Sequence, residues 1–213
     1  MQTTRRHAGI ALLVFTLGTF AALLMTAAPA GNYSLSQIHG YLAPGARATI
    51  FAGAVIGVLA ALALLYYLSV LRAGMLPGRG RDLAWGSGIA AAASAAAGWM
   101  IAAAIPIVYA QGGGHVTLTP SVVYTFGVLS AGMVYGPAML FTGVAVIIAA
   151  RQLATAPRWW RVLGYIGGAC AILSSAYFPY YLFAAYGLVV GAWGLLAKRA
   201  PVTAPQREAV TAA

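Results

Sequence analysis

Acidic side chains are almost absent from this sequence. Asp82 and Glu208 are the only carboxylates among 213 residues, and no charged residue or histidine is predicted deep inside an apolar segment. Proteolysis by an aspartyl pair needs two carboxylates, and coupled transport usually relies on ionisable groups inside the membrane, although backbone carbonyls can also bind sodium. The sequence therefore lacks the side chains that aspartyl proteolysis and most coupled transport require.

Cysteine and phosphate-binding motifs are also scarce. Cys170 is the single cysteine, which excludes an intrachain disulfide and a zinc site built from several thiolates. The sequence has no phosphate loop for ATP. A serine nucleophile such as Ser174 or Ser175 would need a base at its own depth, and the sequence offers none. We therefore expect a protein that is not an enzyme and that uses no metal and no cofactor.

Charged side chains of either sign are few. Only 7% of the residues are charged and 62% are hydrophobic, whereas a soluble domain carries about 25% charged residues. The net charge of +10 comes from basic residues in short segments between apolar runs, where such residues orient a membrane protein. The sequence predicts an all-α, polytopic transmembrane helix bundle in the inner (plasma) membrane, with the lipid bilayer and not nucleic acid as its partner.

A membrane-spanning helix needs about 20 predominantly apolar residues. The apolar runs predict spans at residues 7–28, 50–71, 83–110, 122–150, 162–177 and 180–197. Residues 1–199 then form a single transmembrane domain, and residues 200–213 form a disordered cytoplasmic tail. The first run resembles a signal peptide that ends near Ala27-Ala28-Pro29-Ala30, but its length favours a retained helix.

The last apolar stretch decides the predicted topology. Residues 162–197 carry no charge, and this stretch is too long for one ordinary crossing. The segment Phe178-Pro179-Tyr180-Tyr181 is typical of a turn at the headgroup level. Six spans with both termini in the cytoplasm leave Arg47 as the one basic residue outside, against eleven inside. Five spans would place Lys198 and Arg199 outside, against the positive-inside pattern, so we predict six.

Glycines recur in pairs four residues apart, which puts two missing side chains on one helix face and lets a neighbouring backbone approach. The four pairs are Gly53 and Gly57, Gly132 and Gly136, Gly164 and Gly168, and Gly187 and Gly191. They indicate either close packing within a compact bundle or a face for dimer formation. We expect Gly136→Leu to be more disruptive than Ala149→Leu, because Ala149 is assumed to face lipid.

Pro137 follows Gly136 near the middle of the fourth predicted span. Proline removes one backbone donor and displaces the carbonyl four residues earlier, which belongs to Met133. Broken helices at the membrane midplane are where transporters hold substrates, but proline kinks are also common without any ligand. Tyr135 lies beside the break and is suited to hydrogen-bond a ligand or a neighbouring carbonyl. Tyr135, Met133 and Pro137 are therefore the candidate ligand-binding residues.

The whole chain resembles the uncharacterised six-helix integral membrane families that are common in actinobacteria. The resemblance rests on Arg6-x-x-Gly9 at the start of the first span and on Pro157-Arg158-Trp159-Trp160-Arg161 before the fifth. These families imply a bacterial membrane protein without a defined activity. We expect a non-enzymatic membrane component or scaffold that packs with itself, with lipid or within a larger membrane complex. The alternative is a small carrier or binding protein for a neutral or lipophilic ligand at the broken fourth helix.

Overall fold

The computed structural model describes residues 2–27, 34–113, 115, 118–153, 156–176 and 178–196. Throughout these residues the regular structure is helical, which confirms the predicted all-α class. The predicted tail, residues 200–213, lies outside the described residues. The helical elements are α1 (Gln2–Thr26), α2 (Leu35–Tyr41), α3 (Pro44–Gly74), α4 (Arg79–Gln111), α5 (Pro120–Met133), η1 (Val134–Ala138), α6 (Met139–Gln152), α7 (Arg158–Ile172), η2 (Leu173–Ala176) and α8 (Phe178–Leu196).

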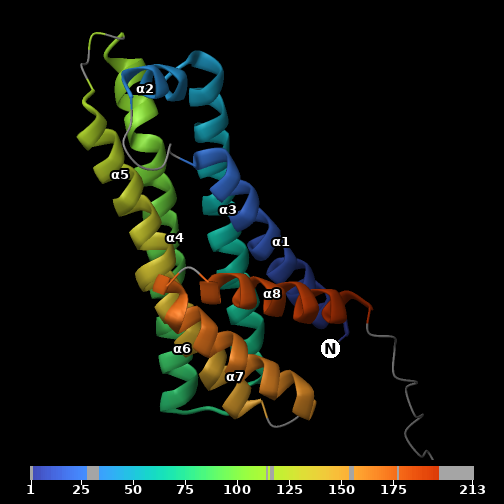
Figure 1. Ribbon diagram of the computed structural model, residues 1–213. Coiled ribbons are helices and arrows are strands. Elements are labelled where there is room, and N and C mark those ends of the chain that lie inside the picture. The colour runs from blue at the N-terminus through green and yellow to red at the C-terminus, as the bar shows by residue number, and fades with distance from the viewer. Residues whose placement is uncertain are drawn as a thin grey trace, which may run out of the picture.

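Several of these helices coincide with long apolar runs of the sequence. In an apolar environment, backbone groups find hydrogen-bond partners only within the helix itself, so such runs fold as helices. In the part of the chain that the structure describes, four helices are long and apolar enough to cross a membrane, namely Arg6–Thr26, Pro44–Gly74, Arg79–Gln111 and Pro120–Gln152. The chain is therefore consistent with a multi-pass membrane protein. The last of these helices consists of α5, η1 and α6 in continuous succession (Figure 1).

Six crossings are not shown. The predicted fifth and sixth spans overlap α7 and α8, but α7 has only 15 residues, and the apolar part of α8 covers Tyr180–Leu196. These two helices form a hairpin through the short 3-10 helix η2. Figure 1 shows the hairpin in the half of the bundle opposite α2, with α8 passing in front of α3 toward the start of α1.

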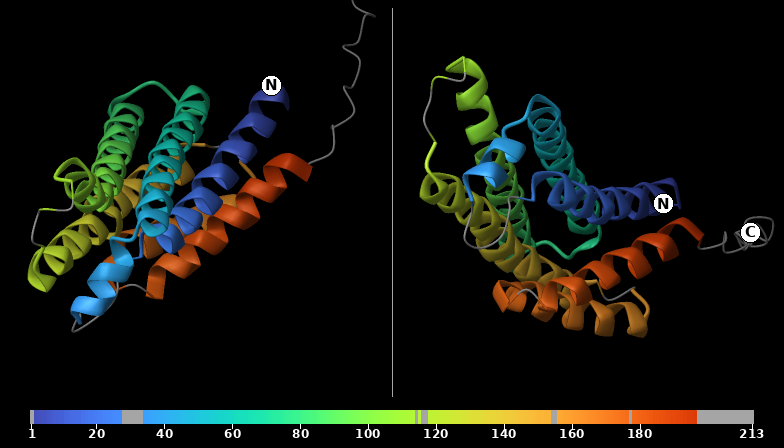
Figure 2. Two further views of the ribbon diagram at one scale, coloured as in Figure 1. Left: turned by 90° about the horizontal axis from the view of Figure 1, so that it is seen from above. Right: turned by 45° about the horizontal axis from the view of Figure 1, so that its top comes forward.

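The long helices run antiparallel and bring sequence-distant segments together. A Cβ atom on Gly53 of α3 would lie 2.6 Å from the Met25 Cβ atom at the end of α1, and a Cβ on Gly9 would lie 2.8 Å from the Gly191 carbonyl of α8. The start of α1 therefore lies beside the end of α8, as Figure 2 also shows. At the centre of the bundle, Trp99 is 2% exposed and its indole fills the space over Gly57.

The short helix α2 was missed by the hydropathy pattern, although its start has a local sequence signal. The Ser34 hydroxyl accepts a hydrogen bond from the Gln37 N–H at 3.3 Å, and the Ser34 N–H donates to Gln37 Oε1 at 2.9 Å. This reciprocal arrangement is a capping box, which satisfies the otherwise unpaired donors at a helix start. Ile38 of α2 is buried in a small cluster with Ile105 and Val123, so α2 covers one end of α4 and α5.

Candidate functional site

The predicted break in the fourth span is present as a π-helical turn. Pro137 lies inside η1, Val134–Ala138, and the helix continues on both sides of it. A π turn pairs the carbonyl of residue i with the N–H of residue i+5. This register allows the N–H of Ala138 to serve the Met133 carbonyl in place of the N–H that Pro137 lacks. The proline is therefore accommodated by local rewinding and not by an interruption of the helix.

The backbone at the break is bound by another part of the chain. The Ser174 hydroxyl in η2 donates a hydrogen bond to the Tyr135 carbonyl at 2.6 Å, and Ser174 is fully buried. The Tyr135 ring meets the Tyr180 ring edge-on, with 5.1 Å between the centroids. The hairpin apex thus contacts the break from both η2 and α8. The sequence singled out Tyr135 and Pro137, but it gave no reason to pair them with Ser174.

This contact lies halfway along the long helices. Ala61, Ala95 and Ala138 form one buried cluster, and they lie near the middles of α3, α4 and the continuous helix Pro120–Gln152. Tyr180 also meets Phe20 of α1, with 5.7 Å between the ring centroids. The apex of the hairpin is therefore level with the middles of α3, α4 and the continuous helix Pro120–Gln152, and it meets α1 in its last two turns.

Gly132 and Gly136 do not lie at a helix crossing within this chain. A Cβ atom added at either glycine would meet no atom within 4 Å among the described residues. Of the two roles predicted for the glycine pairs, packing against a neighbouring helix of the same chain does not apply to this pair, and the role as a dimer face stays a prediction. The assumed lipid-facing position was also wrong, since Ala149 is fully buried.

The other six predicted glycines do lie at close contacts with neighbouring elements. Gly164 would place a Cβ atom 2.8 Å from the Ala150 Cβ atom, and Gly191 would place one 2.7 Å from the Leu13 side chain. Gly187 faces Thr16, Gly168 faces Ile147, and Gly53 and Gly57 face α1 and Trp99. Gly143 was missed: its Cβ atom would collide with the Gly168 carbonyl. Gly143 has no glycine partner four residues away, so the pair pattern did not reveal it.

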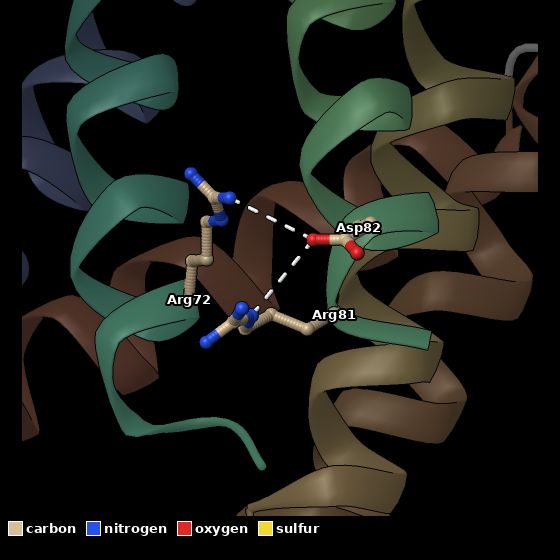
Figure 3. Close-up of polar contacts among 3 residues, drawn as sticks. All are labelled: Arg72, Arg81 and Asp82. Atoms are coloured by element: carbon tan, nitrogen blue, oxygen red, sulfur yellow. Dashed lines mark ion pairs between the residues drawn. The ribbon is translucent and has the colours of Figure 1, made fainter. Parts of the chain in front are cut away.

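A second feature lies at the turn between α3 and α4. Gly78 adopts a φ of 143°, which favours glycine, and it allows α4 to begin directly after the turn. The turn brings Arg72 at the end of α3 opposite Arg81 and Asp82 at the start of α4 (Figure 3). The Arg72 guanidinium also lies over the Trp85 ring, 5.2 Å from its centroid.

These side chains border an open cleft of about 330 Å³, lined by Ser69, Arg72, Ala73, Arg81 and Trp85. We call it the arginine cleft. Asp82 Oδ1 lies 3.6 Å from Arg72 Nη2 and 3.8 Å from Arg81 Nε, so both contacts are longer than hydrogen bonds. The sequence analysis used these arginines only to orient the chain. Their convergence could not be read from spacing, because it depends on the geometry of the α3–α4 turn.

No family model, no curated protein and no solved structure matches this chain. The resemblance to six-helix bacterial families therefore stays a prediction, and no residue role is transferred from a relative. Among the described residues, no three His, Cys, Asp or Glu side chains come together as metal ligands.

Proposed function

We propose that this chain is a non-enzymatic membrane component, a scaffold whose C-terminal hairpin packs into one half of the bundle. The observation that carries the proposal is the hydrogen bond from Ser174 to the Tyr135 carbonyl. The backbone at the helix break is where a carrier would hold a polar ligand group. Here a buried serine of the same chain binds it, which favours a structural role for the break.

The distribution of charge supports an orientation with both termini in the cytoplasm of a bacterial inner (plasma) membrane. The ends of α3 and α6 and the starts of α4 and α7 lie at one end of the bundle (Figure 1). Arg72, Arg79, Arg81, Arg151, Arg158 and Arg161 occupy these positions. Arg47 lies near the start of α3 at the opposite end. By the positive-inside pattern, the arginine-rich end faces the cytoplasm.

The hairpin then enters and leaves the membrane on the cytoplasmic side. Its apex is level with the middle of the continuous helix Pro120–Gln152, as the contact of Tyr180 with Tyr135 supports. At 1.5 Å per residue, the 15 residues of α7 extend about 22 Å, which is less than the ~30 Å hydrocarbon core. We favour four full crossings and a re-entrant hairpin over six crossings. Non-helical backbone at this depth is tolerated because protein surrounds it.

Cysteine labelling separates the two topologies. In a Cys170→Ala background, Tyr181→Cys places a thiol at the 62% exposed apex side chain, and Arg47→Cys and Leu76→Cys serve as outer and inner controls. With a membrane-impermeant maleimide on intact cells, we expect Arg47→Cys to react and Tyr181→Cys to remain unlabelled. Labelling of Tyr181→Cys from outside as fast as Arg47→Cys would establish six crossings and refute the re-entrant hairpin.

A carrier for a neutral or lipophilic ligand is the second candidate, and one observation favours it. Gly132 and Gly136 leave an open strip of backbone beside Tyr135. The same strip is a suitable contact for a second copy of the chain or for a larger membrane complex, because small residues allow close approach.

A vesicle assay tests scaffold against carrier. We expect vesicles containing the purified chain to swell in gradients of neutral solutes, such as glycerol and urea, at the rate of empty vesicles. Faster swelling that Gly136→Leu abolishes would refute the scaffold proposal, because the added side chain enters the open strip beside the break, where a Cβ atom meets no atom within 4 Å. The association of labelled chains, followed by photobleaching in bilayers, measures whether the same substitution weakens self-assembly.

A further inference from the structure

We propose that the arginine cleft binds a phosphate group, and that the source of this phosphate is the headgroup of an anionic phospholipid. The proposal goes beyond the scaffold role and does not depend on the depth of the hairpin. It rests on three features of the described residues around the cleft: an excess of positive charge, guanidinium groups with spare donors, and an apolar surface that continues from the cleft along α3 and α4.

The charge at the cleft is not balanced. Arg72 and Arg81 share the single carboxylate of Asp82, and both approach the same oxygen, Oδ1 (Figure 3). The Asp82 side chain is 64% exposed, so solvent screens its charge. One positive charge therefore remains uncompensated within the cluster. The other carboxylate of the chain, Glu208, lies outside the described residues.

The guanidinium donors are also available. Both distances to Asp82 exceed hydrogen-bond length, so the carboxylate does not hold the arginine N–H groups in a forked pair. Arg81 Nε is buried and has no hydrogen-bond partner in the described part of the chain, so a phosphate would be bound through the terminal Nη atoms of Arg72 and Arg81. Guanidinium groups bind phosphate oxygens through paired N–H donors. The Ser69 hydroxyl, by contrast, already donates to the Tyr66 carbonyl at 2.7 Å.

The cleft lies where a lipid headgroup would lie. Arg72 directly follows the apolar run of α3, and Leu83 begins the apolar run of α4 just after Arg81. Trp85 lines the cleft beneath the Arg72 guanidinium. Tryptophan and arginine are both favoured at the level of the headgroups, because each joins an apolar body to a polar end. Anionic lipids also concentrate basic segments at the cytoplasmic surface.

An apolar surface leads from the cleft toward the membrane interior. Leu62 and Tyr66 precede the cleft residues Ser69 and Ala73 on one face of α3, at a spacing of three or four residues that aligns them. On α4, Ile89 follows Trp85 by one turn. Leu62, Tyr66 and Ile89 are all about half exposed. The acyl chains of a lipid can pack on this apolar surface, which is continuous with the arginine cleft. A free phosphate ion would not contact it.

Native mass spectrometry of the delipidated protein tests the proposal with three probes: phosphatidylglycerol, diacylglycerol with the same acyl chains, and inorganic phosphate. We expect phosphatidylglycerol to bind more tightly than diacylglycerol. We expect Arg81→Gln to weaken this binding about tenfold, the effect of losing one charge-assisted hydrogen bond. The matched control Arg158→Gln removes an exposed arginine from the same end of the bundle, and it should leave the affinity unchanged.

A gain of affinity provides an independent check that does not rely on a loss. Asp82→Asn removes the competing carboxylate and should tighten phosphatidylglycerol binding several-fold. Leu76→Lys adds the same charge to the same turn outside the cleft lining, and it should have little effect. Arg81→Lys keeps the charge but loses the planar fork, so an intermediate affinity is expected.

Each other outcome has a defined meaning. Equal binding of diacylglycerol, or an equal loss in Arg158→Gln, would overturn the proposal, because binding would then need no phosphate or no cleft. If millimolar inorganic phosphate binds at the cleft and displaces the lipid in an Arg81-dependent way, the phosphate site stands and its source is a soluble ion. Circular dichroism of each variant verifies that affinity changes do not come from unfolding.

Discussion

Removal of one hydroxyl at the hairpin apex tests how the C-terminal third of the chain is held. Ser174→Ala deletes the donor to the Tyr135 carbonyl, while the volume of this fully buried position hardly changes. A net intramolecular hydrogen bond contributes about 0.5–1.5 kcal/mol, and side-chain bonds between membrane helices average about 0.6 kcal/mol. We therefore expect the free energy of unfolding to fall by about 1 kcal/mol.

Reversible unfolding in mixed micelles, titrated with sodium dodecyl sulfate and followed by tryptophan fluorescence, measures this change. Thr142→Val is the matched control, because the Thr142 hydroxyl is equally buried but donates to the Ala138 carbonyl four residues earlier in the same continuous helix. Its loss removes no bond between separate elements. If Ser174→Ala leaves the unfolding curve unchanged, or shifts it no more than Thr142→Val does, the hydrogen bond does not anchor the hairpin.

Three further outcomes are expected. Gly143→Leu should lower the free energy of unfolding by about 1–3 kcal/mol or more in the same titration, because even its Cβ atom meets the Gly168 carbonyl. Gly136→Leu should change the free energy of unfolding by no more than about 0.5 kcal/mol. Equal losses in the two variants would show that the helix crossing at Gly143 is misplaced. Gly78→Ala should lower the free energy of unfolding by about 1–3 kcal/mol, since the φ of 143° is disfavoured for residues with a Cβ atom. An unchanged midpoint of the unfolding titration would contradict this backbone strain. A cytoplasmic reporter fused after Arg199 should be active, and activity of a periplasmic reporter there would reverse the proposed placement of the C-terminus.

Local composition carried enough information to locate the long apolar helices. Apolar runs near 20 residues favour helices wherever water is absent, because the helix alone satisfies its own backbone groups. Pro137 predicted a break for a similarly local reason, since a missing N–H perturbs the helix whatever surrounds it. The Ser34 and Gln37 capping box was just as local, and it could have located α2.

Spacing along one helix predicted less about contacts between helices. The pair Gly53 and Gly57 and the pair Gly132 and Gly136 have the same pattern, but the first meets α1 and Trp99 and the second meets open space. Gly143, outside any such pair, faces one of the tightest crossings. A glycine pair specifies a face that can be approached closely. It does not specify whether a neighbour is present at that face.

The sequence by itself determined the all-α class, the apolar character of the long helices and the uneven distribution of arginine. Each of these properties depends on residues within one helix or one turn. Only the tertiary structure decided that Ser174 meets the Tyr135 carbonyl and that Arg72 and Arg81 converge on Asp82. These contacts join residues of separate elements, and they depend on helix tilt and on the depth at which the hairpin apex lies. In an apolar solvent, several packings of the same helices satisfy the backbone equally well, so side-chain fit between elements selects one of them.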